Sequence, residues 1–373
     1  MRWIFWGAVL LIAYTYVGYA GWLWLRAYLR PWPVLRAQQE PYLSIVMVVR
    51  NEERWLESKL HNLLELDYPQ ARYQIVLVSD GSTDRTEKVL HAYGDDPRVH
   101  VVLNQLSRGK ASGLNDGIAV ASGAVVVFTD ARQKIESGAI RLLVENLADP
   151  EVGCVSGALM LGDPDAGEAA KGMGLYWRME KTIRELESAS GSVVGATGAL
   201  YAVRRELLDS IPEGTILDDV YIPMQVVRKG KRVVFEPRAR AWDSPDLGAD
   251  REFSRKVRTL TGNYQLVQLA PWLLTRENPI RFEFASHKLL RLAVPFALAA
   301  VLMASMVLSG PVYRSALALQ VLFYGLSLLA GLRLSRGPLA RMSDAALTFV
   351  VLNSAAAVAF VNFVTGRKAV WIR

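Results

Sequence analysis

The sequence is poor in the residues that build disulfides and zinc sites. It has one cysteine and four histidines among 373 residues. Cys154 has no partner for an internal disulfide, and it lies in an apolar, strand-like run typical of core. The histidines are scattered without ligand spacing, so histidine-based zinc chemistry is not expected.

The chain also lacks the stripe of basic and aromatic residues that nucleic-acid-binding proteins carry. Lys and Arg outnumber Asp and Glu by 43 to 36, which gives a net charge of +7. Much of this excess flanks apolar segments. A membrane surface and an anionic substrate therefore explain the charge better than nucleic acid does.

Charged residues are absent from residues 3–25, a run that spans roughly 35 Å as a helix and can cross a bilayer. Tryptophans stand near both of its ends, and arginines follow from Arg26 onward, as expected if the carboxyl end is cytoplasmic. A cleaved signal peptide is the alternative, but the run is too long and no small-x-small cleavage site follows. We expect a retained transmembrane helix within residues 1–30, followed by a proline-containing linker.

Residues 40–250 alternate between strand-like and helix-like stretches. Apolar strand-like runs begin near Leu43, Tyr73, Val99 and Ala124, and helical spacing of apolar residues follows the first three. This alternation predicts a parallel sheet with right-handed crossovers. We therefore expect an α/β domain in this region.

The pattern changes after residue 250. Residues 251–288 mix basic and apolar side chains, which indicates amphipathic helices at the membrane surface. A soluble helix packed on the catalytic domain is the alternative, and the two are compatible. Residues 289–373 contain three uncharged runs that are long enough, or nearly so, to span a membrane: 292–313, 315–332 and 345–366.

The charges that flank these runs bear on their topology. If all three cross, the arginines near residues 333–341 fall inside, as the positive-inside rule prefers. Arg367, Lys368 and Arg373 then fall outside, which the rule does not prefer. We expect one N-terminal and about three C-terminal crossings, with an interfacial or re-entrant run as the alternative.

Polar clusters stand where the predicted strands end or the helices begin. Asn51 and Asp80 follow the first two strands, and Asp130 follows the fourth. One Asp-Gly after a strand is usually only a turn. Because the carboxyl ends of parallel strands share one edge of a sheet, however, these three side chains are expected to converge there.

The residue types in these clusters suit a nucleotide diphosphate. Glu52 and Asp80 can accept hydrogen bonds from a base or ribose, and Lys110, beside a glycine and near a helix start, is placed for phosphate. A solvated surface lysine is the alternative for Lys110. Asp130 can hold Mg²⁺ or Mn²⁺ together with phosphate oxygens and water.

These segments resemble the family 2 glycosyltransferases, the group that includes the cellulose, chitin and hyaluronan synthases. The resemblance covers about residues 40–260. It rests on motifs at 49–53, 78–84, 108–115, 128–131, 195–205 and 217–219.

The resemblance implies a GT-A fold, Rossmann-like with a mostly parallel sheet, and an inverting transfer from a nucleotide sugar, commonly a UDP-sugar. It assigns Asp80 to the nucleotide, Asp130 to the metal, and Asp219 in the pair Asp218-Asp219 to the catalytic base. Inversion needs such a base to take the proton of the acceptor hydroxyl. A helix predicted over residues 220–229 would lower the pKa of the acid pair, and the adjacent carboxylate would raise it. The alternative is that both acids only cap this helix.

Two positions depart from the family pattern. Arg132 stands where the metal motif often has a second acid or an asparagine, and a cation cannot bind a metal. The nearest match to the Gln-x-x-Arg-Trp motif of processive synthases begins at Arg255 and lacks both the Gln and the Trp. Arg255 and Arg258 are still expected to reach the diphosphate. The missing Trp weakens the case for long-chain processivity.

The function expected from the sequence is a membrane-embedded inverting glycosyltransferase that transfers a sugar to a growing polysaccharide or a lipid-linked glycan. The alternatives are a single transfer onto a lipid carrier and a membrane-anchored protein that binds a nucleotide sugar without turnover. The expected partners are a UDP-sugar donor, the acceptor and the lipid bilayer, with an export subunit left open. We expect a multi-pass protein of the inner membrane whose catalytic domain is cytoplasmic.

Overall fold

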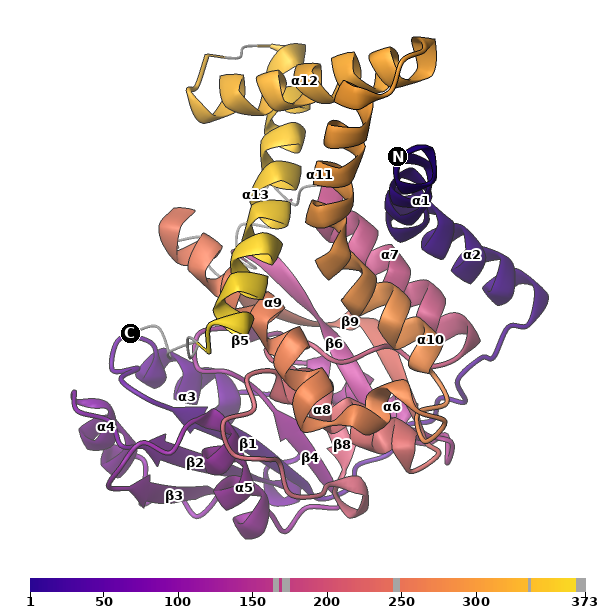
Figure 1. Cartoon of the computed structure of the whole chain (residues 1–373). Coiled ribbons are helices and arrows are strands. Elements are labelled where there is room, and N and C mark those ends of the chain that lie inside the picture. Colours follow the sequence, from indigo (N-terminus) through magenta and orange to yellow (C-terminus); the bar gives the residue numbers. More distant parts are fainter. Residues whose placement is uncertain (164–167, 170–174, 244–248, 335–336, 367–373) are drawn as a thin grey trace.

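The computed structural model describes residues 1–163, 168–169, 175–243, 249–334 and 337–366 (Figure 1). Arg336, Arg367, Lys368 and Arg373, which entered the sequence-based topology, lie outside the described residues. The helices are α1 (Arg2–Ala13), α2 (Tyr19–Leu29), α3 (Leu56–Leu64), α4 (Thr86–Ala92), α5 (Lys110–Val120), α6 (Ala139–Asn146), α7 (Leu175–Ser190), α8 (Asp218–Arg228), α9 (Ala249–Leu269), α10 (Arg281–Phe284), α11 (Leu290–Val307), α12 (Pro311–Gly331) and α13 (Pro338–Val364). The strands are β1 (Leu43–Val49), β2 (Tyr73–Asp80), β3 (Val99–Asn104), β4 (Val125–Phe128), β5 (Lys134–Ile135), β6 (Val152–Asp163), β7 (Glu168–Ala169), β8 (Tyr201–Arg204) and β9 (Arg232–Asp243).

One mixed sheet of nine strands forms the centre of the domain, in the order β3-β2-β1-β4-β8-β6-β9-β5, with β7 paired to β6. β1 runs parallel to both β2 and β4, and β2 runs parallel to β3. The four strands expected from the sequence are therefore present and parallel. β8 runs antiparallel between β4 and β6, and β5 is antiparallel to β9 at the edge.

Helix α5 lies unusually close to the sheet. A Cβ atom at Gly113 would lie 2.7 Å from Val48 Cγ1, and one at Gly117 would lie 2.6 Å from Val46 Cγ1. Only glycine therefore allows this approach of the helix to β1. The contact fixes the start of α5, and with it Lys110, at the carboxyl edge of the parallel strands.

Helix α8 begins two residues earlier than the sequence predicted. It covers Asp218–Arg228 rather than residues 220–229, so Asp218 and Asp219 lie in its first turn instead of preceding it. Leu217 occupies the N-cap position and its side chain makes no capping hydrogen bond. The two carboxylates still lie at the positive end of the helix, where the backbone N–H groups favour negative charge.

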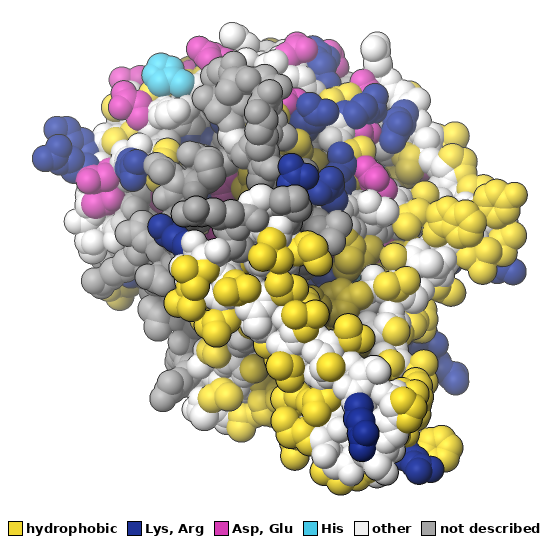
Figure 2. Space-filling model, turned by 90° about the horizontal axis from the view of Figure 1, so that it is seen from above, with side chains coloured by type: hydrophobic (Ala, Val, Ile, Leu, Met, Phe, Trp, Pro, Cys, Tyr) yellow, Lys and Arg dark blue, Asp and Glu magenta, His cyan; other side chains and the backbone are white. Residues whose placement is uncertain are grey.

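Within the described residues, four helices are long and apolar enough to cross a membrane: Arg2–Leu29, Arg281–Val307, Pro311–Gly331 and Leu339–Val364. One is N-terminal and three are C-terminal, as the sequence predicted. Seen from above, hydrophobic side chains cover much of this face, and charged side chains gather toward one side of it (Figure 2).

The C-terminal helices leave the domain and return to it. α11 and α13 stand side by side, and α12 lies across their far ends (Figure 1). The ring of Phe360 near the end of α13 lies 5.1 Å from that of Phe296 near the start of α11. Phe363 also stacks on Tyr264 of α9 at 5.3 Å. The end of α13 thus lies on the catalytic-domain side, the arrangement expected if one of the three runs is interfacial.

Candidate functional site

A cavity of about 430 Å³ opens where β4, the start of α8 and helix α9 meet. The segment 196–199, one side of α7, parts of β6 and β9, and Leu352 of α13 also line it. Six of the side chains singled out from the sequence line it: Lys110, Asp130, Asp218, Asp219, Arg255 and Arg258.

Lys110 joins the two acidic elements of the cavity. Its Nζ atom lies 3.0 Å from Oδ1 of Asp130 and 3.2 Å from Oδ2 of Asp218. Burial lowers the pKa of this amine, but Asp130, Asp218 and Asp219 raise it by more, so the net pKa lies well above its usual range. Lys110 is therefore a fixed positive charge in the cavity.

The carboxylates of Asp130 and Asp219 face the same glycine. A Cβ atom at Gly198 would lie 3.4 Å from Oδ2 of Asp130 and 3.5 Å from Oδ2 of Asp219. The same loop is tied to α8, since the backbone N–H of Ala196 donates to the carbonyl oxygen of Asp219 over 2.7 Å. The absence of a side chain at position 198 leaves room beside both acids.

Asp219 titrates above an ordinary aspartate. Burial raises its pKa, and the neighbouring charge of Asp218 raises it further, while Lys110 and Lys288 oppose both effects. The sequence left open whether the helix end or the second acid prevails. In the structure burial and the second acid prevail, which brings the carboxylate nearer to the range in which a base exchanges protons at neutral pH.

Glu52 lies close enough to Asp130 to sense its charge. Burial raises the pKa of Glu52 to about 7, Arg132 lowers it, and Asp130 raises it. Glu52, which follows β1, is not among the residues that line the cavity, and its contact with a base or ribose stays a prediction.

Asp243, which sequence reasoning did not single out, also belongs to the cavity wall. This buried carboxylate at the end of β9 lies 3.1 Å from Arg132 and 3.6 Å from Arg255, measured from carboxylate oxygen to guanidinium nitrogen. Arg132 therefore points to Asp243, not into the place of a second metal ligand. In the sequence, Asp243 stands at the end of an apolar run with strand-like alternation, and this position could have marked it as a candidate site residue.

Asn51 and Asp80 order loops around the cavity instead of lining it. Asp80 is fully buried, and its carboxylate accepts hydrogen bonds from Ser107 Oγ at 2.8 Å and from the N–H groups of Arg108 and Gly109 at 2.8 and 2.9 Å. Asn51 has a positive φ of 55° and accepts a hydrogen bond from the N–H of Thr83 over 2.8 Å. β1, β2 and β4 end at one edge of the sheet, but the side chains of Asn51 and Asp80 bind neighbouring loops and do not line the cavity with Asp130.

Lys59 is a second cation that the sequence did not indicate. Its buried Nζ atom donates to Thr129 Oγ1 at 2.9 Å and to the carbonyl oxygen of Gln133 at 2.6 Å. Burial lowers the pKa of Lys59 to about 7, and Asp130 opposes this. Lys59 thereby stabilises the turn that contains Asp130, through hydrogen bonds to residues on either side of it.

Residues 44–211 match the family model described as Glycosyl transferase family 2. The chain carries a family 2 glycosyltransferase domain. The expected family is thus confirmed by the part of the chain that holds Lys110 and Asp130.

Two poly-beta-1,6-N-acetyl-D-glucosamine synthases, from Staphylococcus epidermidis and from Staphylococcus aureus strain COL, are 24% identical to the chain over 246 residues. The match covers 63% of this chain and 58% of each synthase. The mannosyltransferase PcManGT from Pyrobaculum calidifontis, solved with GDP-Man and Mn2+, superposes with a TM-score of 0.74 and 24% identity over 96% of this chain and 98% of that one. This superposition confirms the predicted GT-A fold.

The glycosyltransferase domain has one candidate metal ligand that faces the cavity. In the described part of the chain, no group of three or more His, Cys, Asp and Glu side chains is placed to hold a metal ion. Asp130 has 39% of its side chain exposed, and its Oδ2 atom is directed toward Gly198 while Oδ1 is held by Lys110. The site therefore fits a divalent ion held by one carboxylate together with oxygens of a bound diphosphate.

Proposed function

We propose that the protein is a membrane-embedded inverting glycosyltransferase that transfers a sugar from a nucleotide sugar to a growing polysaccharide or a lipid-linked glycan. The observation that carries this proposal is the placement of Lys110, Asp130 and Asp219 around one cavity of a family 2 glycosyltransferase domain. We take residues 40–250 as the catalytic domain and place it on the cytoplasmic side of the inner membrane.

The donor side of the proposed site is basic. Lys110, Arg255 and Arg258 provide the positive charge that binds a diphosphate, preferably that of a UDP-sugar. Asp130 would hold Mg²⁺ or Mn²⁺, which would supply positive charge beside the diphosphate. Asp80 contributes to donor binding indirectly, because its carboxylate holds the backbone of Arg108 and Gly109, which directly precede Lys110.

Asp219 is the proposed catalytic base. Its carboxylate lies across Gly198 from Asp130, so an acceptor hydroxyl between them can give its proton to Asp219 while the sugar carbon is attacked from the opposite face. The raised pKa of Asp219 favours this proton transfer. Asp218 keeps Lys110 in place through their ion pair.

One observation favours a lipid-linked acceptor. An apolar groove of about 440 Å³ is lined by Tyr264 and Val267 of α9, Leu292 and Phe296 of α11, and the end of α13. α9 and α13 also line the catalytic cavity, through other residues, so a hydrocarbon chain in the groove would contact the same two helices. A single transfer onto a lipid carrier is therefore the second candidate function.

The full-length protein in lipid nanodiscs should be screened with nucleotide sugars for released nucleoside diphosphate. We expect release with one class of donor, strengthened by Mg²⁺ or Mn²⁺ and by a membrane extract as the source of acceptor. The products should then be separated by size, since a ladder indicates a polymer and a single band a single transfer. Binding of a nucleotide sugar without any release would instead support the non-catalytic alternative.

A further inference from the structure

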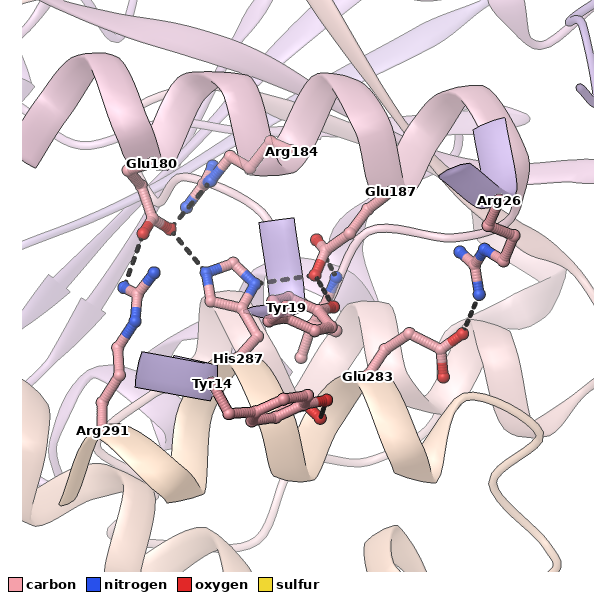
Figure 3. Close-up of polar contacts among 11 residues, drawn as sticks. Tyr14, Tyr19, Arg26, Glu180, Arg184, Glu187, Glu283, His287 and Arg291 are labelled. Carbon is pink, nitrogen blue, oxygen red and sulfur yellow. Dashed lines mark hydrogen bonds and ion pairs between the residues drawn. The ribbon is translucent and has the colours of Figure 1, made fainter. Parts of the chain in front are cut away.

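A buried polar cluster joins the membrane helices to the catalytic domain, away from Asp130 and Lys110. Its centre is His287, which lies in a π-helical turn, Ala285–Leu289, between α10 and α11 and is 1% exposed. Figure 3 shows the imidazole ring between Glu180 and Glu187 of α7. Tyr19 of the N-terminal membrane helix reaches the same place.

Both ring nitrogens of His287 face carboxylate oxygens. Nδ1 lies 2.8 Å from Oε1 of Glu187, and Nε2 lies 3.1 Å from Oε1 of Glu180. A neutral imidazole carries only one N–H, so it would turn a bare nitrogen lone pair toward one of the two carboxylates. An imidazolium donates from both nitrogens and meets both acceptors.

The surroundings keep the two carboxylates ionised. Burial raises the pKa of Glu180, but His287 and Arg291 lower it by more, so that it lies well below its usual range. Burial likewise raises the pKa of Glu187 while His287 and Tyr19 lower it, again with a net decrease. Both decreases include the positive charge of His287 itself, so the ionised carboxylates and the imidazolium stabilise one another, and the two nitrogen-to-oxygen contacts carry the argument.

Other charged groups also face this ring from each packed element. Arg291 of α11 lies 2.7 Å from the second oxygen of Glu180, and Arg184 of α7 lies 3.4 Å from the first. Tyr19 of α2 donates its hydroxyl to Glu187 over 2.6 Å. The charge of Lys288 also lowers the pKa of both glutamates. Three separate segments of the chain thus meet at the two glutamates.

Both glutamates lead to the catalytic cavity. Glu180 and Arg184 are part of its wall. Glu187 accepts a hydrogen bond from the N–H of Val194 over 3.3 Å, and the next residues form the loop that ends at Gly198 between Asp130 and Asp219. A displacement of α7 would therefore move the wall and the loop together.

We propose that His287 is a positioning residue, held as an imidazolium between Glu180 and Glu187, that sets α7 and the loop to Gly198 for transfer. The part concerning transfer rests on the proposed function, whereas the protonation of the ring does not. The cavity depends on this contact, because Glu180 and Arg184 of α7 line it together with Lys110, Asp130 and Asp219.

The protonation can be read directly by NMR, because the chain has four histidines and the other three, His61, His91 and His100, are exposed. Protein labelled with ¹⁵N in the histidine rings, in nanodiscs at pH 7.5, should show an imidazolium ring in which both nitrogens carry a proton. His287→Gln should remove the imidazolium signal alone. A neutral tautomer at His287 would overturn the proposal, whatever the activity of the protein.

The positioning role is tested by separating binding from turnover. His287→Gln leaves an amide that can donate to only one carboxylate, and we expect kcat to fall at least about tenfold while UDP binding changes less than about twofold. Tyr14→Phe is the matched control, since it removes the 2.8 Å hydrogen bond between Tyr14 and Ser286 in the same junction but touches neither glutamate. Its kcat should stay within about twofold of the wild type.

Thermal unfolding of both variants is measured in parallel. A merely structural role predicts that His287→Gln lowers the melting temperature but leaves kcat of the folded protein unchanged, and this result would refute the positioning role. If the wild type shows no transfer with any donor, the proposed function fails. The NMR result then still decides the protonation of His287.

Discussion

The ammonium group of Lys110 donates a hydrogen bond to Asp130 over 3.0 Å, which links the expected phosphate ligand to the expected metal ligand. Asp130 Oδ1 is thereby occupied, and Oδ2 remains on the side of Gly198 and Asp219. Charge in the cavity is thus balanced within the protein. A diphosphate with its metal ion can replace this pairing by binding the lysine through phosphate and the aspartate through metal.

Removal of the Lys110 charge should weaken donor binding. For Lys110→Met we expect the affinity for UDP to fall roughly tenfold or more, since a hydrogen bond to a charged group contributes about 1.5–3 kcal/mol. Calorimetric titration with UDP measures this. Lys229→Met is a suitable control, because Lys229 pairs with Asp209 outside the cavity and should leave the affinity unchanged.

Asp219→Asn should separate binding from transfer. The amide keeps the size of the side chain but cannot take a proton, so we expect UDP affinity within about threefold of the wild type and a loss of transfer of at least about 100-fold. Release of UDP from the donor, followed over time, gives the rate. Substantial turnover in this variant would remove Asp219 as the base.

The pH dependence of transfer should reflect the same carboxylate. Because burial and Asp218 raise the pKa of Asp219 to about 6, we expect kcat/KM to fall as the pH drops below about 6, when the base becomes protonated. Asp218→Asn removes the adjacent charge and should move the acidic limb of the pH profile of kcat/KM to lower pH. A limb that stays in place in that variant would mean that another group sets it.

Asp130→Ala should abolish the effect of a divalent ion on donor binding. In the wild type we expect UDP affinity to increase with Mg²⁺ or Mn²⁺, and in the variant the affinity should be the same with and without the ion. Arg132→Ala serves as a neighbouring control, because Arg132 pairs with Asp243. If the metal effect survives in Asp130→Ala, the ion is held by other groups.

Glu52 should reduce stability at alkaline pH. Its pKa is raised by burial to about 7 in the folded protein, so the neutral form favours folding below the ordinary glutamate pKa, and this contribution is lost as the pH rises through 7. Glu52→Gln should therefore have a higher melting temperature than the wild type at pH 8 and an equal one near pH 4. The opposite order at pH 8 would show that the ionised carboxylate is stabilised instead.

The parallel half of the sheet was predictable because its information is local. β1, β2, β3 and β4 are contiguous apolar runs, and the polar residue that follows each one marks the carboxyl edge. The order of β8, β6 and β9 was not predictable, because an antiparallel strand between distant partners leaves no signal in its own few residues. The start of α8 was placed two residues late because Leu217 is not a recognisable N-cap residue.

The same limit applies to the site. Lys110, Asp130 and Asp219 follow from motifs within short segments. Asp243 and His287 gain their roles from partners that are distant in the sequence. Asp243 pairs with Arg132, 111 residues away, and His287 contacts Glu187, 100 residues away. Asp80 shows the reverse case: its motif was evident, yet only the fold reveals that its carboxylate is used by its own neighbouring loop.

One wall of the catalytic cavity includes Leu352, a residue of the long C-terminal helix α13. The cavity is thus closed partly by a helix that is long and apolar enough to cross a membrane. A soluble fragment ending before α9 would keep the acids and the lysine but would lack this wall. If α13 lies in a bilayer, as its length and composition allow, the lipid around it would border one wall of the proposed acceptor site.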